Sequence, residues 1–215
     1  MIDYSLCLVT DEKIQDIETI LHIILQAIKG GVFIVQLREK TISTKNFVYK
    51  ATKIKSILDQ KNIPLIINDR VDVALAIDAA GIHLGQDDIP YDLARKLLGK
   101  NKIIGLSVST AEEIEQARTW DVDYFGVGAI FKTQTKDMKN PVLGLEGLKK
   151  IRNITAKPII GIGGINKTNA KEVINAGADG IAVVSAICGN DDPFLATLNL
   201  KTIISKAKTT LTRSF

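Results

Sequence analysis

Several polar residues that can bind phosphate or metal ions stand directly after short apolar segments. The two sharpest cases are Asn68-Asp69 and Gln86-Asp87-Asp88. Magnesium is usually held by one or two carboxylates together with waters and substrate phosphates. Asp69 and Asp88 are therefore candidates to share one ion, although an aspartate just before a helix is also a common N-cap. Their position on successive strand ends favours the metal site.

A second cluster, Gln36 to Lys40, places an amide, a guanidinium and an ammonium group at the end of another apolar run. Arginine can hold phosphate oxygens through paired hydrogen bonds, and lysine adds a compact charge. The cluster suits a diphosphate, although taken alone it is more typical of a solvated loop.

Three further apolar runs end in residues suited to anion binding: Ser107, Gly161 to Ile165, and Val184-Ser185. Glycines let backbone N–H groups approach an anion closely at a helix start. In parallel barrels the loops after the seventh and eighth strands form the recurrent phosphate site. The alternative is a glycine turn that packing requires. The histidines are weak candidates for catalysis. His83 lies within a predicted strand, where a hydrogen-bonded core imidazole is favoured over a general base.

The apolar runs, rich in β-branched residues, predict strands. They lie near Ser5–Val9, Phe33–Leu37, Pro64–Asn68, Gly81–Leu84, Ile103–Ser107, Tyr124–Val127, Pro158–Ile162 and Gly180–Val184. Helical spacing of apolar residues predicts helices between them, at Ile14–Lys29, Lys45–Lys61, Ala111–Trp120 and Lys167–Ala176. Eight strand–helix units with right-handed crossovers predict an α/β fold, a (β/α)8 TIM barrel in a single domain covering residues 1–215. An open doubly wound sheet is the alternative.

Composition agrees with one α/β domain of 215 residues, 46% hydrophobic and 5% aromatic. The 28 basic and 24 acidic residues give a net charge of +4, spread along the chain, which argues against nucleic-acid binding. No segment approaches the roughly 18 apolar residues of a membrane span, and no leader is evident, so we expect a cytoplasmic protein. The sequence leaves open whether the protein forms a homo-oligomer.

The irregular stretch from Gly128 to Leu145 is long for a loop between a strand and a helix. It predicts a mobile lid or a disordered surface loop.

Six motifs together resemble the thiamine-phosphate synthase family in order and spacing, from the first strand to the eighth. They are Gln36 to Lys40, Asn68-Asp69-Arg70, His83 to Asp88, Thr133 to Lys136, Gly161 to Ile165 and Val184 to Ile187. The resemblance implies a transferase. Its substrates would be 4-amino-2-methyl-5-(diphosphooxymethyl)pyrimidine and 4-methyl-5-(2-phosphooxyethyl)thiazole, and its products thiamine phosphate and pyrophosphate. It also implies a dissociative, magnesium-assisted substitution, in which pyrophosphate departs before the thiazole nitrogen attacks.

The resemblance further implies roles for individual residues. Asp69 and Asp88 would bind Mg²⁺. The catalytic residues would be Arg38, Lys40, Ser107 and Lys136. The pyrimidine diphosphate would be surrounded by Gln36, Arg38, Glu39, Lys40, Asn68, Ser107 and Lys136, with Leu37 also among the substrate-binding residues. The thiazole phosphate would be held by Thr133, Gln134, Thr135, Gly164, Val184 and Ser185.

This chain departs from the family pattern at a few positions. Ala129 and Lys132 stand where prolines are common, which bears on the closing of the loop, and Ser109 stands where relatives often have histidine. Two alternative functions are a thiazole tautomerase, a sister barrel that relies on a histidine near position 109, and a regulatory barrel that binds phosphate without catalysis. The missing histidine argues against the first. The set of Asp69, Asp88, Lys40 and Lys136 argues against the second.

Overall fold

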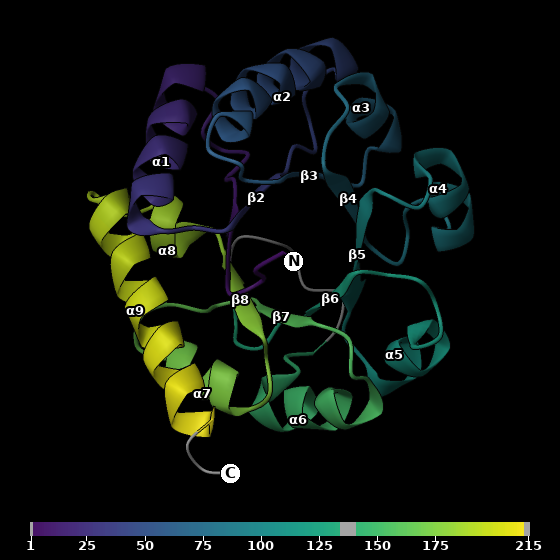
Figure 1. The fold of residues 1–215 in the computed structure, drawn as a ribbon, viewed down its shortest axis with the longest axis vertical. Helices are drawn as coiled ribbons and strands as arrows, with labels where there is room; N and C mark the ends of the chain where they lie inside the picture. The colour runs from purple at the N-terminus through teal and green to yellow at the C-terminus, as the bar shows by residue number, and fades with distance from the viewer. Residues whose placement is uncertain (1, 134–140, 213–215) are drawn as a thin grey trace.

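The computed structural model describes residues 2–133 and 141–212, and within them eight parallel strands close into a barrel. Each strand pairs with its neighbours along the chain, and β1 pairs with β8 to complete the ring. The helices surround the strands (Figure 1). The predicted TIM barrel is therefore confirmed, and the alternative of an open sheet is excluded.

The strands are β1 (Leu6–Val9), β2 (Ile34–Leu37), β3 (Leu65–Asn68), β4 (Gly81–Leu84), β5 (Ile103–Val108), β6 (Tyr124–Val127), β7 (Ile159–Ile162) and β8 (Gly180–Val183). Each starts and ends within one residue of its predicted run. The helices are α1 (Ile17–Gly30), α2 (Thr44–Asp59), α3 (Val71–Ala76), α4 (Tyr91–Leu98), α5 (Ala111–Ala117), α6 (Gly144–Ile154), α7 (Ala170–Asn175), α8 (Ser185–Cys188) and α9 (Pro193–Thr212).

The strands are apolar on both faces because each face is covered. One set of side chains, which includes Cys7, Ile34, Ile66 and Ile160, fills the inside of the barrel. The alternating set, which includes Leu8 and many other aliphatic residues, packs outward against the helices. Parallel strands buried on both faces read as continuous apolar runs, which is why composition located them well. The polar residues that end these runs consequently stand at one rim of the ring.

The long helix α9 covers the barrel beside α1 and α7 (Figure 1). Its close approach to α1 depends on Gly30, where an added Cβ would lie 2.6 Å from Cβ of the buried Thr197. Helix α1 is capped at both ends. The side chain of Asp16 accepts from Thr19 N at 2.8 Å at its N-terminus, and Gly31 follows its C-terminus in the left-handed region. None of the helices in the described ranges has the length and hydropathy of a membrane span.

Candidate active site

Two carboxyl groups stand at the ends of the adjacent strands β3 and β4. Asp69 follows β3 directly in a left-handed conformation (φ 62°), and its N–H donates to His83 O at 2.8 Å. Asp88 lies in the loop after β4, where its Oδ2 accepts from Gly85 N at 2.6 Å. The strained backbone at Asp69 and the tight turn at Asp88 together aim both side chains at the rim of the barrel.

The two carboxyl groups face each other, and their proximity perturbs the pKa of Asp88. Burial raises the pKa of Asp88 most, and the facing Asp69 carboxyl raises it further, while Lys40 and the Gly85 N–H act in the opposite direction. Like charges in a partly dry site disfavour each other's ionised form. The ammonium group of Lys40, which forms an ion pair with Asp69 Oδ2, supplies one neighbouring positive charge.

The cationic residues after β2 are held by contacts that sequence reasoning did not find. Glu12, in the loop between β1 and α1, accepts from Arg38 Nη1 at 2.6 Å and from Lys40 N at 3.0 Å. The hydroxyl of the buried Thr10 accepts from Arg38 N at 3.0 Å. The loop of Glu12 has no motif of its own, so its acidic side chain is the one feature of the sequence that could have indicated a contact with Arg38.

Glu39 and Leu37 lie in the same segment but turn away from the rim. Glu39 is 4% exposed and forms a buried ion pair with Lys50 of α2, which also donates to Ile14 O at 3.1 Å. Burial raises the pKa of Glu39, and the hydrogen bond from Lys50 lowers it. Leu37 is fully buried in the layer between barrel and helices. Their side chains therefore position the segment rather than face a ligand.

An amide pair lines the rim between β2 and β3. Gln36 Nε2 donates to Asn68 Oδ1 at 3.0 Å, and both residues are buried. On the far side of β4, Gln86 Nε2 donates to Ser107 O at 2.6 Å and so ties the loop after β4 to the end of β5. Gln36, Asn68 and Ser107 thus belong to one continuous polar arc with the two aspartates.

Ser107 is joined to the interior of the barrel through His83. Its Oγ lies 2.8 Å from His83 Nε2, and His83 Nδ1 lies 3.0 Å from the hydroxyl of the buried Tyr124. Burial raises the pKa of Tyr124 well above its usual value, so the phenol stays protonated. His83 is thus the hydrogen-bonded core imidazole that the sequence predicted, and sequence reasoning missed Tyr124.

The glycine turn after β7 packs against the first part of the loop after β6. Gly163 and Gly164 have φ of 99° and 65°, and a Cβ on Gly164 would lie 2.5 Å from Lys132 O. Phe131 N donates to Gly163 O at 3.0 Å, so residues 128–133 run along β7 in a fixed path. Val184 and Ser185 lie beside this turn, at the end of β8 and the start of α8. Gln134, Thr135 and Lys136 fall outside the described residues, as do residues 137–140 of the predicted lid.

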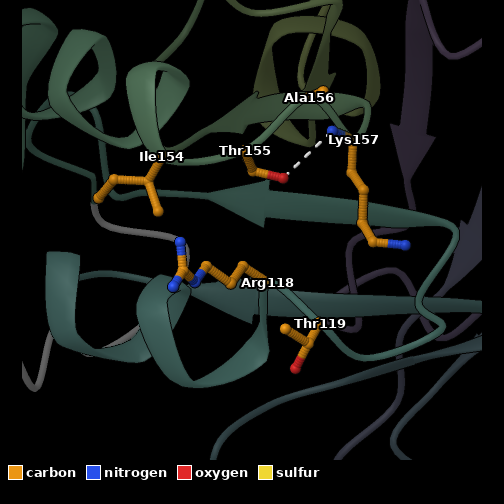
Figure 2. Close-up of a pocket in the computed structure, with 6 residues that line it drawn as sticks. All are labelled: Arg118, Thr119, Ile154, Thr155, Ala156 and Lys157. Atoms are coloured by element: carbon orange, nitrogen blue, oxygen red, sulfur yellow. Dashed lines mark hydrogen bonds between the residues drawn. The ribbon is translucent and has the colours of Figure 1, made fainter.

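One surface cavity lies away from the polar arc. Figure 2 shows Arg118, Thr119, Thr155 and Lys157 around a hollow of about 430 Å³. These residues follow α5 and α6 and precede β6 and β7, so the hollow is at the amino end of the strands. Substrate sites of parallel barrels lie at the carboxyl end. We therefore place the chemistry at the polar arc and not in this cavity.

The polar arc fits a magnesium ion. Across residues 2–133 and 141–212, no group of three or more histidine, cysteine, aspartate or glutamate side chains is placed to hold a metal. Magnesium needs no such cage, because one or two carboxylates suffice when substrate phosphates and waters complete its octahedron. The facing carboxyls of Asp69 and Asp88, with the raised pKa of Asp88, are such a pair.

A closed parallel barrel with acidic, cationic and amide groups on its carboxyl rim is typical of TIM-barrel enzymes that handle phosphorylated substrates. The comparisons with known proteins are more specific. The profile of the thiamine monophosphate synthase family matches residues 6–187. A thiamine-phosphate synthase of Vibrio parahaemolyticus is 48% identical over 190 residues, which cover 88% of this chain and 93% of that protein. One from Clostridium botulinum is 46% identical over 199 residues, covering 93% and 97%.

A solved structure agrees with these relatives. The thiamine phosphate pyrophosphorylase of Pyrococcus furiosus superposes with a TM-score of 0.85 at 36% identity, covering 96% of this chain and 98% of that one. The chain belongs to the thiamine monophosphate synthase family. Its reaction is accordingly the synthesis of thiamine phosphate, a transferase reaction, and the resemblance inferred from the six motifs is confirmed.

Proposed function

We propose that the polar arc joins the pyrimidine diphosphate to the thiazole phosphate by a dissociative substitution in which pyrophosphate leaves first. The observation that carries this proposal is the convergence of Asp69, Asp88 and Lys40 at the ends of β2, β3 and β4. A diphosphate leaving group needs positive charge around its oxygens, and this is where the described residues concentrate metal-binding and cationic groups.

Asp69 and Asp88 would hold Mg²⁺ between them. Magnesium, when bound, would neutralise the charge that develops on the departing diphosphate. Lys40, released from its ion pair with Asp69 as that carboxylate turns to the cation, would then reach a diphosphate oxygen. Arg38 would supply a planar guanidinium that can bind two oxygens at once.

Gln36 and Asn68 would recognise the pyrimidine ring. Because Gln36 Nε2 already donates to Asn68 Oδ1, each amide has a fixed orientation. Gln36 Oε1 then accepts from an amino group, and Asn68 Nδ2 donates to a ring nitrogen or a phosphate oxygen. Such a matched pair suits the edge of an aminopyrimidine, whose ring shares the positive charge left on the methylene carbon.

Ser107 would donate its hydroxyl proton to the diphosphate. With the protonated Tyr124 donating to His83 Nδ1, the imidazole proton would stand on Nε2, and that nitrogen would donate to Ser107 Oγ. The serine proton is then left to point at the substrate. His83 and Tyr124 are positioning residues in this account, and no strong base is required, since the step depends on electrostatic preorganisation and exclusion of water.

The thiazole phosphate would bind at the glycine turn after β7 and the end of β8. Gly164 lets the backbone approach a phosphate closely, and Val184 and Ser185 lie on the neighbouring strand end. Thr133 stands where the loop after β6 meets this turn. We assign Gln134 and Thr135 to the same phosphate and Lys136 to the departing diphosphate, which would make the loop a cover for both substrates.

Mass spectrometry of the purified protein with both substrates tests the proposal. We expect thiamine phosphate and one pyrophosphate per product, with turnover that requires Mg²⁺. Ring isomerisation of the thiazole alone would favour a tautomerase, and binding without turnover a regulatory barrel. Asp69→Ala and Asp88→Ala are each expected to lose most activity with an unchanged circular dichroism spectrum, and near-normal turnover at limiting Mg²⁺ would contradict the metal assignment.

A further inference from the structure

Glu12 occupies the place where an anionic ligand of the loop after β2 would lie. One carboxylate oxygen accepts from Arg38 Nη1 at 2.6 Å, and the other accepts from the backbone N–H of Lys40 at 3.0 Å. Two oxygens of one anion on a guanidinium and a neighbouring N–H form the arrangement in which proteins hold phosphate groups. Among the described residues, Arg38 has an ion pair only with Glu12.

The carboxylate can leave this place without disturbing the barrel. Glu12 lies in the loop between β1 and α1, and the side chain is 24% exposed. The backbone of the loop after β2 has separate anchors, since Thr10 Oγ1 accepts from Arg38 N at 3.0 Å and Glu39 pairs with Lys50. Arg38 therefore keeps its backbone position when Glu12 turns to solvent.

We propose that Glu12 is an internal competitor for the diphosphate site, displaced when a diphosphate binds and returning to Arg38 and Lys40 N as pyrophosphate leaves. This inference rests on the proposed function, in which Arg38 and Lys40 bind the diphosphate. A site that must first release its own anion binds every diphosphate more weakly by the same factor, product included. Glu12 thereby limits product inhibition and speeds the release of pyrophosphate.

Calorimetric titration of pyrophosphate, with Mg²⁺ and without thiazole phosphate, tests the competition. We compare the wild type with Glu12→Gln, which keeps the shape and loses the charge, and with Asp11→Asn. The second variant is the matched control, because Asp11 carries the same charge in the same loop and its Oδ1 accepts from Lys13 N rather than from Arg38. We expect Glu12→Gln to bind pyrophosphate about tenfold more tightly, as the loss of one charge-assisted contact implies.

Two further readouts separate competition from other roles. Glu12→Asp, too short to reach both donors, is expected to show an intermediate gain, and the KM for thiazole phosphate is expected to stay unchanged in every variant. Unchanged or weaker pyrophosphate binding by a folded Glu12→Gln would overturn the proposal, as would an equal gain in Asp11→Asn. If the wild type itself binds no pyrophosphate, the diphosphate assignment of Arg38 fails, and this inference with it.

Discussion

The carboxyl groups of Asp69 and Asp88, from the ends of neighbouring strands, face each other at the rim of the barrel. Two facing carboxylates repel each other, which is why the pKa of Asp88 is raised beyond the effect of burial. A divalent cation between them would turn this repulsion into attraction. The stability of the folded protein should therefore depend on whether a cation occupies this pair.

Magnesium should therefore stabilise the fold through this pair. At a concentration about tenfold above its Kd, an ion that binds only the native state adds about 1.4 kcal/mol, which for a chain of this size raises Tm by roughly 3–6 °C. Asp69→Asn should abolish the shift. Asp72→Asn, which alters an exposed carboxylate paired with Arg70, should retain it. Differential scanning calorimetry measures both, and an equal shift in Asp69→Asn would contradict the metal assignment.

Breaking the buried ion pair of Lys50 and Glu39 should destabilise the protein. Lys50→Met leaves a buried carboxylate without its partner and should cost about 3–5 kcal/mol. The variant Glu39→Leu/Lys50→Met should recover most of that loss. Lys55→Met, which removes a partly exposed i,i+4 partner of Asp59 on the same helix, should cost under about 0.5 kcal/mol. Urea unfolding measures all three.

The deficit of Lys50→Met should depend on pH in a definite direction. Burial already raises the pKa of Glu39, and loss of Lys50 removes the largest effect that lowers it. A carboxyl whose folded pKa lies above its unfolded value loses stability as pH rises between the two values. We expect a smaller deficit at pH 5 than at pH 8. A deficit that is the same at both values would show that Glu39 keeps its charge without Lys50.

His83 should orient Ser107 for catalysis. His83→Leu removes the hydrogen bonds of the imidazole to Tyr124 and Ser107. We expect kcat to fall about tenfold, the value of one hydrogen bond, with the KM for thiazole phosphate unchanged. The buried Tyr124 hydroxyl loses its partner as well, at a cost of about 1–3 kcal/mol. Adding Tyr124→Phe should restore stability but not kcat. His22→Leu, at an exposed position of α1, is the control, and an unchanged kcat in His83→Leu would refute the positioning role.

Gly164 should be required for the thiazole phosphate site. Gly164→Ala combines a left-handed φ of 65° with a Cβ 2.5 Å from Lys132 O, so the loop after β6 must shift. We expect the KM for thiazole phosphate to rise. Gly99→Ala provides the comparison, because Gly99 also has a positive φ but its Cβ would meet nothing within 4 Å. Each should lose roughly 1–3 kcal/mol from strain, and equal KM values would place the thiazole phosphate elsewhere.

The sequence predicted the strands closely because they are apolar on both faces and bounded by turn residues. It predicted α1 and α2 through their periodicity, but it did not predict α9, whose threonine and lysine residues obscure an apolar face. The strand-end residues Asp69, Asp88 and Lys40 were predicted to converge, and the structure brings them together. Convergence could be anticipated because parallel strands end at one rim.

The supporting contacts of the site could not be predicted from a single chain. Glu12 lies 26 residues before Arg38 in a loop without a motif, and only the closing of the barrel brings their side chains together. Glu39 was expected to face the substrate, but its side chain turns inward to Lys50 of α2. The direction of a side chain within a loop depends on contacts made across the fold, which residue spacing does not encode.

A crystal grown with Mn²⁺ and pyrophosphate would show whether Asp69 and Asp88 share one divalent ion. We expect one anomalous difference peak between the two carboxylates, with pyrophosphate oxygens on the same ion and Lys40 turned from Asp69 to the diphosphate. A peak elsewhere on the barrel, or pyrophosphate bound with no metal between Asp69 and Asp88, would contradict it.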